Sequence, residues 1–223
     1  MSKQRQHILV INPNSDEMVT ENMAQELKRF NFSEGPRIEC VTLSDGPLGI
    51  ESQADIESVT IPLTKMVSKK KEVDAFVIAC YSDPGLHVCR EASEKPVFGI
   101  QECGILTAMS RGDRFGVIAL QESSMRRHQR YMRQMGVMER LAGERVAELS
   151  VRESVSGEKT FEKLLSAAKQ LRDLDQADTI ILGCAGMAKH RTKLESKIGI
   201  PVIEPVQSAV SMAMHSLLST RQH

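Results

Sequence analysis

Two cysteines stand at the ends of similar apolar runs in this chain. Cys80 ends the run in DAFVIAC and is followed by YSDPGL, and Cys184 ends the run in DTIILGC and is followed by AGMA. In both places small or turn-forming residues lead into a helical pattern. The amide-rich start of a helix stabilises a thiolate. We therefore expect both sulfurs to be exposed in a cleft and to have lowered thiol pKa values.

Such a pair of thiols suits inversion at a carbon atom. One thiolate removes the proton beside a carbonyl group, and the opposite thiol returns a proton to the other face of the planar intermediate. Reactive contacts of about 3 to 3.5 Å on each side of the carbon place the sulfurs roughly 7 Å apart, whereas a disulfide needs about 2.05 Å. A racemase cleft and a structural bridge are therefore exclusive geometries.

The elements that would position these cysteines occur twice in the chain. Strand and helix patterns alternate, as is typical of a mostly parallel sheet covered by helices. Four pairs of segments match: HILVINPNSDEM from His7 with RFGVIALQESSM from Arg114, RIECVTLS from Arg37 with RVAELSVR from Arg145, VDAFVIAC with ADTIILGC, and PVFGIQECGILTAM from Pro96 with PVIEPVQSAVSMAM from Pro201. The orderly spacing of the matches indicates an internal duplication.

This duplication predicts an α/β fold of two pseudo-symmetric lobes, Rossmann-like or flavodoxin-like, with mostly parallel sheets and a cleft between them. Ligands of open α/β sheets bind beyond the carboxyl ends of the strands. Cys80 and Cys184 would then face each other across one cleft. We predict that residues 1–100 with 208–223 form lobe 1 and that residues 101–207 form lobe 2.

Local signals set the expected helix starts. Ser15 or Asp16 is the expected cap of the first helix, and Asp83 that of a helix whose first residue is Pro84. Pro62 is expected to start or to kink the helix that contains it.

Composition restricts the class of partner. The 223 residues include 29 Lys and Arg and 29 Asp and Glu, so the formal net charge is zero. There is thus no overall electrostatic footprint for nucleic acid or anionic lipid. No apolar stretch approaches the roughly 20 residues of a membrane-spanning helix, and no secretory signal is apparent. The odd number of scattered cysteines indicates reduced thiols. We expect a cytoplasmic homo-oligomer that acts on a small molecule, without nucleic-acid or membrane partners.

The motifs around both cysteines resemble the aspartate/glutamate racemase superfamily and, within it, the hydantoin and allantoin racemase branch. The resemblance covers nearly the whole chain, through INPNS, GPLGIES, ACYSDPGL, RFGVIAL, LGCAGMA and GIPVIEPVQSAV. It implies a cofactor-independent racemase with two pseudo-symmetric lobes, in which Cys80 and Cys184 are the catalytic pair. No metal site is expected.

Departures from the superfamily pattern concern the substrate. Its amino-acid racemases usually have Asn-Thr after the first cysteine and Thr-His after the second, residues that hold an α-carboxylate. Here the followers are Tyr81-Ser82-Asp83 and Ala185-Gly186-Met187, which points toward a ring imide or ureide. Hydantoin-type members often have Phe at the position of Tyr81, so the preferred 5-substituent stays open.

Further candidates for substrate binding lie at strand ends, in one loop and beside the cysteines. Asn12 is either a turn residue or a ligand contact at the end of the first strand. The loop DGPLGIE is either a turn or a lid that touches substrate through Leu48 or Ile50. The predicted substrate-binding residues are Asn12, Ile50, Tyr81, Ser82, Asp83, Gln121, Gly183, Ala185 and Gly186.

Other conspicuous residues receive structural interpretations. Cys40, Cys89 and Cys103 are expected to be small buried side chains. The basic segment SSMRRHQRYMRQMG, which contains Arg127 and His128, is expected to be a solvated or oligomer-facing surface, since it carries a single aromatic residue.

Two other classes of function stay open. One keeps the fold and changes the chemistry: a racemase of an acidic amino acid, or a decarboxylase or isomerase of dicarboxylic acids. The other is a ligand-binding or assembly protein on the same scaffold, for which replacing either cysteine would change nothing.

Overall fold

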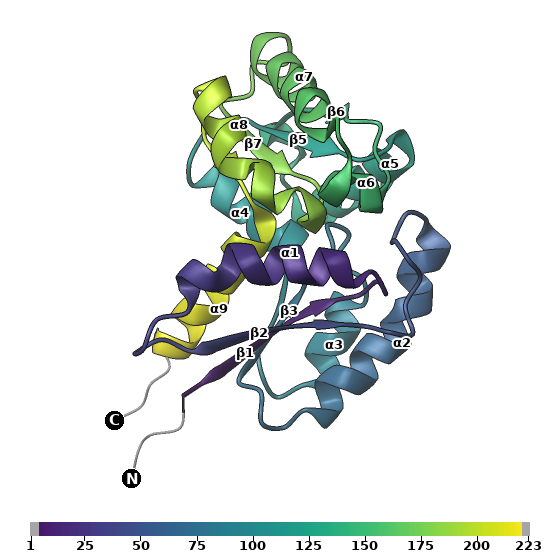
Figure 1. Ribbon diagram of the computed structural model, residues 1–223, viewed down its shortest axis with the longest axis vertical. Coiled ribbons are helices and arrows are strands. Elements are labelled where there is room, and N and C mark those ends of the chain that lie inside the picture. The colour runs from purple at the N-terminus through teal and green to yellow at the C-terminus, as the bar shows by residue number, and fades with distance from the viewer. Residues whose placement is uncertain (1–4, 220–223) are drawn as a thin grey trace.

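The computed structural model describes residues 5–219 and contains two parallel four-stranded sheets. The first sheet has the order β2-β1-β3-β4 and consists of β1 (His7–Asn12), β2 (Arg37–Thr42), β3 (Ala75–Ile78) and β4 (Val97–Gly99). The second has the equivalent order β6-β5-β7-β8 and consists of β5 (Phe115–Ala119), β6 (Leu141–Val146), β7 (Thr179–Leu182) and β8 (Val202–Ile203). Figure 1 shows the sheets in two lobes, which confirms the predicted fold class.

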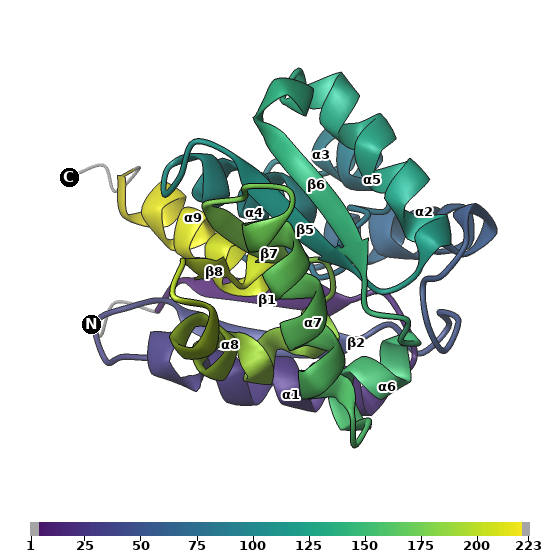
Figure 2. The same cartoon turned by 90° about the horizontal axis from the view of Figure 1, so that it is seen from above.

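Helices connect the strands and cover both sheets. In the first half they are α1 (Glu17–Leu27), α2 (Gln53–Lys69), α3 (Leu86–Ala92) and α4 (Ile100–Met109). In the second half they are α5 (Glu122–Met135), α6 (Val151–Ser156), α7 (Thr160–Asp173), α8 (Arg191–Ile198) and α9 (Pro205–Ser219). Asp16 caps α1 by accepting from the Met18 N–H, as predicted. Figure 2, a view from above, shows α6 of the second half beside α1 of the first, and these two helices are in contact.

The central strands have the composition of strands that are buried on both faces. Every residue of β1, β3, β5 and β7 is buried, and most are aliphatic. The outer strands β2 and β6 are largely half-buried. This difference explains why the central strands are the clearest features of the sequence, since parallel strands covered on both faces read as continuous apolar runs.

The last helix of each half lies between the lobes. Helix α4 packs against α9 and contacts β5, β7 and β8, whereas α9 contacts β1, β3 and β4. Their buried side chains, such as Ile105 and Val210, belong to one hydrophobic cluster that includes residues of both sheets. The lobes are therefore held together by a shared core. The predicted boundaries, 1–100 with 208–223 and 101–207, stay a prediction.

One of the four segment matches was wrong by four residues. In the first sheet Ile11 pairs with Val41, and in the second sheet its equivalent Ile118 pairs with Arg145. Val41 and Arg145 are thus structural counterparts, whereas the sequence match placed Arg37 opposite Arg145. The register shift between Phe115 and Gly116, together with the mixed composition of β6, obscured the correct alignment.

Two helix starts also differ from the predictions. Helix α2 begins after Ser52, which forms a capping box with Asp55, and it runs through Pro62. Pro62 therefore does not start this helix, and a kink there stays a prediction. Helix α3 begins at Leu86 rather than Pro84, because Asp83 and Gly85 both have left-handed backbone conformations that interrupt a helix.

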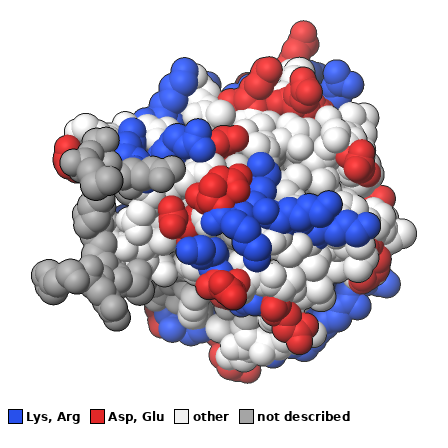
Figure 3. Space-filling view, turned by 90° about the horizontal axis from the view of Figure 1, so that it is seen from below, with Lys and Arg blue, Asp and Glu red and all other residues white. Residues whose placement is uncertain are grey.

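The surface carries both signs of charge. Basic and acidic side chains lie close together on the face in Figure 3. Among residues 5–219, no helix has the length and apolar character needed to cross a membrane.

Candidate active site

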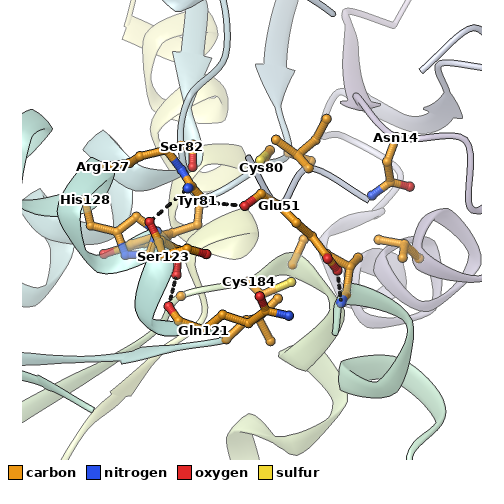
Figure 4. A pocket seen from close by; sticks show the side chains of 18 residues that line it. Asn14, Glu51, Cys80, Tyr81, Ser82, Gln121, Ser123, Arg127, His128 and Cys184 are labelled. Atoms are coloured by element: carbon orange, nitrogen blue, oxygen red, sulfur yellow. Dashed lines mark hydrogen bonds between the residues drawn. The ribbon is translucent and has the colours of Figure 1, made fainter. Parts of the chain in front are cut away.

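Cys80 and Cys184 lie in equivalent places and line one pocket between the lobes. Each is the second residue after a central strand, β3 for Cys80 and β7 for Cys184. Because the strands are parallel, their carboxyl ends meet at the same edge of each sheet, and the two edges face this pocket. Both cysteines are free thiols. Figure 4 shows their side chains on the two sides of the pocket.

The Cys184 thiol lies close to two hydrogen-bonding groups. The backbone N–H of Gly186 donates to Sγ over 3.4 Å, and the Ser154 hydroxyl lies 3.7 Å from Sγ. The residues of the short 3-10 helix Ala185–His190 after Cys184 orient this amide. A Cβ at Gly186 would lie 2.2 Å from the Ser154 hydroxyl oxygen, so a larger residue here would displace the Ser154 side chain.

The Cys80 thiol receives a backbone hydrogen bond from Ser82 and has a cation nearby. Burial raises its pKa to about 12, and the neighbouring Cys184 adds to this rise. The Ser82 amide and the Arg127 guanidinium lower the pKa of Cys80. Burial is therefore the dominant influence on this thiol.

The expectation of lowered thiol pKa values was wrong for both cysteines, and Cys184 is buried whereas Cys80 is half-buried. Burial also raises the pKa of Cys184, even though the Gly186 amide and the Ser154 hydroxyl act in the opposite direction. The strand-helix junctions do supply the predicted amide donors. However, the lobes close around the sulfurs, and loss of hydration disfavours the thiolate more than these donors favour it.

The structure brings most of the predicted site residues together. Those that line the pocket are Ile50, Cys80, Tyr81, Ser82, Gln121, Gly183, Cys184 and Ala185. Ile50 comes from the loop before α2, whereas Leu48 of the same loop is exposed to solvent. Gly183 allows close packing at the strand end, since a Cβ there would lie 2.5 Å from the Ile118 carbonyl oxygen.

Three predicted binding residues do not line the pocket. Gly186 contacts the Cys184 sulfur through its amide, as described above. Asn12 is fully buried, and its side-chain amide donates to Asn14, Asp16 and Thr20. Asn12 is therefore a structural turn residue, and its neighbour Asn14 lines the pocket instead.

Asp83 caps a helix that is distant in sequence. Its carboxylate accepts from the backbone N–H groups of Gln101 and Glu102, both over 2.9 Å, at the start of α4. Burial raises the pKa of this carboxyl group to about 7. The predictions that Asp83 binds substrate and caps the helix after Pro84 are corrected, because its carboxylate is committed to α4.

Sequence reasoning missed several pocket residues, most of them on helices and three, Glu51, Ala79 and Leu120, in loops. They are Val19, Glu51, Ala79, Leu120, Ser123, Ser124, Arg127, His128 and Val151. Arg127 and His128 were assigned to a solvated or oligomer-facing surface, yet both line the pocket, and His128 is buried with its Nδ1 2.9 Å from Glu144 Oε1. The available signal was that α5 begins directly after β5, so its first turns have to face the cleft.

Comparisons with known proteins agree with this arrangement. Residues 8–213 match the Asp/Glu/Hydantoin racemase family. The hydantoin racemase of Paenarthrobacter aurescens is 34% identical, over 92% of this chain and 89% of its own. That of Pseudomonas sp. (strain NS671) is 35% identical, over 92% and 84%. The structure of the allantoin racemase from Klebsiella pneumoniae has a TM-score of 0.89 at 29% identity and covers 96% of this chain and 88% of that one.

The fold and these relatives define the class of protein as an isomerase of the racemase type. The chain belongs to the Asp/Glu/hydantoin racemase family, in the hydantoin and allantoin racemase branch.

Proposed function

We propose that this protein racemises a 5-monosubstituted hydantoin or allantoin and that Cys80 and Cys184 are its two bases. The observation that carries the proposal is that one free thiol from each lobe lines the same pocket. Two further facts support it: the similarity to hydantoin and allantoin racemases, and the equivalent placement of both cysteines after central strands.

The reaction requires a proton to leave one face of C5 and another to arrive at the opposite face. One cysteine, as thiolate, removes the C5 proton, and the electron pair moves into the adjacent carbonyl to give an enolate. The other cysteine, as thiol, then protonates C5 from the far side and becomes the thiolate. After this turnover the protonation states of the two cysteines are exchanged, so the enzyme is ready to act on the product enantiomer. A second turnover of the first enantiomer requires the thiols to exchange protons, for example with water.

The other pocket residues suit the intermediate of this reaction. Ser82, Ser123 and Gln121 offer hydrogen-bond donors along the wall, and such donors stabilise an enolate oxygen as its charge develops. Val19, Ile50 and Leu120 provide apolar surface that limits water around the reacting carbon.

The test follows single enantiomers of 5-substituted hydantoins and of allantoin in heavy water. We expect enzyme-dependent loss of optical rotation, with deuterium incorporated at the stereogenic carbon. Spontaneous racemisation is measured with a Cys80→Ser/Cys184→Ser double variant at the same pH. If wild-type protein and double variant gave equal rates for every substrate, the proposal would be wrong.

A further inference from the structure

Arg127 is a cation in the pocket wall that the proton-transfer scheme does not use. It lies on the second turn of α5, and its side chain is half-buried. Two of its N–H groups are committed to backbone carbonyl oxygens: Nη1 donates to Ser123 over 2.9 Å, and Nη2 donates to Glu51 over 3.0 Å. These bonds hold the guanidinium in one place beside the Cys80 side of the pocket (Figure 4).

The Arg127 guanidinium is not held in an ion pair within the part of the chain that the structure describes. Burial lowers its pKa, and the nearby Cys80 and Asp55 act in the opposite direction. Among residues 5–219, no carboxylate forms an ion pair with this guanidinium. Its Nε–H is buried and has no hydrogen-bond partner within the same range. A buried donor without an acceptor is costly, and it is costlier when the group is charged. A ligand that brings a negatively charged acceptor to this wall would relieve that cost.

The other charged side chain of the pocket does not fill this role. The Glu51 carboxylate accepts from the backbone N–H of Val151 over 3.1 Å, at the start of α6. Only the backbone carbonyl of Glu51 faces Arg127. Asp55 is likewise committed, because its carboxylate accepts from the backbone of Glu51 and Ser52 and from the Ser52 hydroxyl.

We propose that the substrates of this enzyme carry a carboxylate on the C5 substituent and that Arg127 binds it; the preferred class is therefore 5-(carboxyalkyl)hydantoins. This inference rests on the proposed function and specifies its substrate. The guanidinium matches a carboxylate in charge and in geometry. A ring carbonyl would also accept from Nε–H, but it would bring no negative charge into contact with the guanidinium.

The test compares two substrates of nearly equal shape and different charge. They are 5-(2-carboxyethyl)hydantoin and its uncharged amide, 5-(2-carbamoylethyl)hydantoin, with 5-methylhydantoin as a small neutral reference. We expect wild-type protein to racemise the carboxylate with a kcat/KM about 10- to 100-fold above that of the amide, the range of a charge-assisted hydrogen bond to a buried group.

Variants assign the preference to Arg127. Arg127→Gln should remove most of the difference between carboxylate and amide, and Arg127→Lys should keep part of it. The matched control is Arg130→Gln on the same helix: Arg130 is exposed, donates to the Gln53 side chain and does not line the pocket. This control should retain the wild-type preference.

Two results would overturn the inference. One is an amide racemised as fast as the carboxylate by wild-type protein, and the other is an Arg127→Gln variant that slows both substrates equally. The latter would indicate that Arg127 acts on Cys80 or on the Glu51 loop.

Binding separates this inference from the proposed function. If no hydantoin is racemised, the proposed function fails, and calorimetry with the same carboxylate and amide then decides the inference. Tighter binding of the carboxylate that disappears in Arg127→Gln supports the anion site, and equal or absent binding overturns it.

Discussion

The two cysteines occupy equivalent positions in duplicated lobes, but their surroundings differ. Beside Cys184 lie a backbone amide and the Ser154 hydroxyl, and the carboxylates of Glu204 and Glu51 raise its thiol pKa. Beside Cys80 lie a backbone amide and the Arg127 guanidinium, which lower its thiol pKa, and the Asp83 carboxylate, which raises it. The duplication therefore preserved the positions of the sulfurs while the electrostatic field around each of them diverged.

The same contrast appears where the last helix of each sequence half begins. In the first lobe the Asp83 carboxylate, from the loop after β3, accepts from the start of α4. In the second lobe Glu204 directly precedes α9, and its carboxylate accepts from Val206 and Gln207. Gly99 is the counterpart of Glu204, and a Cβ at Gly99 would lie 2.3 Å from Cγ of Asp83. Each half thus caps its helix with a buried carboxylate from a different position.

The largest expected effect is on catalysis by the two halves of the site. Cys80→Ser and Cys184→Ser should each lower racemisation by about 10²- to 10⁴-fold, because each removes one acid-base group. Each variant should still exchange the C5 proton of one enantiomer, and the two variants should favour opposite enantiomers. NMR of deuterium uptake from each pure enantiomer measures this. Cys40→Ser, outside the pocket, is the control. If Cys80→Ser and Cys184→Ser both exchanged the C5 proton of the same enantiomer, the assignment of one cysteine to each face would be contradicted.

The second effect concerns the two caps. Gly99→Ala should lower the free energy of unfolding by about 1 to 3 kcal/mol, because the added methyl group overlaps the Asp83 carboxylate. Gly99→Glu alone should lower the free energy of unfolding more than Gly99→Glu combined with Asp83→Ala does. The reason is that the double variant copies the arrangement at Glu204. Urea unfolding measures both differences. Simple additivity of the two substitutions would show that the cap positions are not interchangeable.

The third effect is a pH dependence of stability. Burial raises the pKa of Asp83 and of Glu204 to about 7, above their ordinary values of 3.8 and 4.5. The folded protein therefore binds these protons more tightly than the unfolded chain. Their contribution to the free energy of unfolding should fall as the pH rises from about 4 through about 7, by at most about 1.4 kcal/mol per pH unit for each group.

Urea unfolding between pH 5 and 8 tests this sign. Lowered pKa values at His7 and His190 act in the opposite direction. For this reason the informative quantity is the difference between wild type and Asp83→Asn. The free energy of unfolding of wild type, minus that of Asp83→Asn, should fall as the pH rises. A difference that does not depend on pH would show that Asp83 does not titrate in this range.

The smallest expected effect is at the Ser154 hydroxyl beside Cys184. Ser154→Ala should lower kcat/KM by about fivefold, the equivalent of one hydrogen bond to the sulfur. Both enantiomers should be affected equally, because the equilibrium constant between them is one. The control is Ser156→Ala, an exposed serine on the same helix. Equal changes in both variants would exclude a specific role for Ser154.

Much of the site could be predicted because local pattern encodes it. Buried parallel strands are continuous apolar runs, so the strand before each cysteine was visible, and the repetition of that strand placed Cys80 and Cys184 in one cleft. Ile50, Tyr81, Ser82, Gln121, Gly183 and Ala185 followed from their positions at strand ends or in a long loop. The outer strand β6 lacks such a run, and its alignment was wrong for that reason.

The sequence by itself therefore determined the duplicated α/β plan and the paired cysteines, since both depend on short-range periodicity. Only the tertiary structure decided which polar groups face the pocket. Asp83 finds its partners 18 and 19 residues away, and Arg127 reaches a loop 76 residues earlier in the chain. The raised thiol pKa values likewise come from closure of the lobes around the sulfurs. Burial and long-range hydrogen bonds exist only once the lobes have packed, so no local pattern records them.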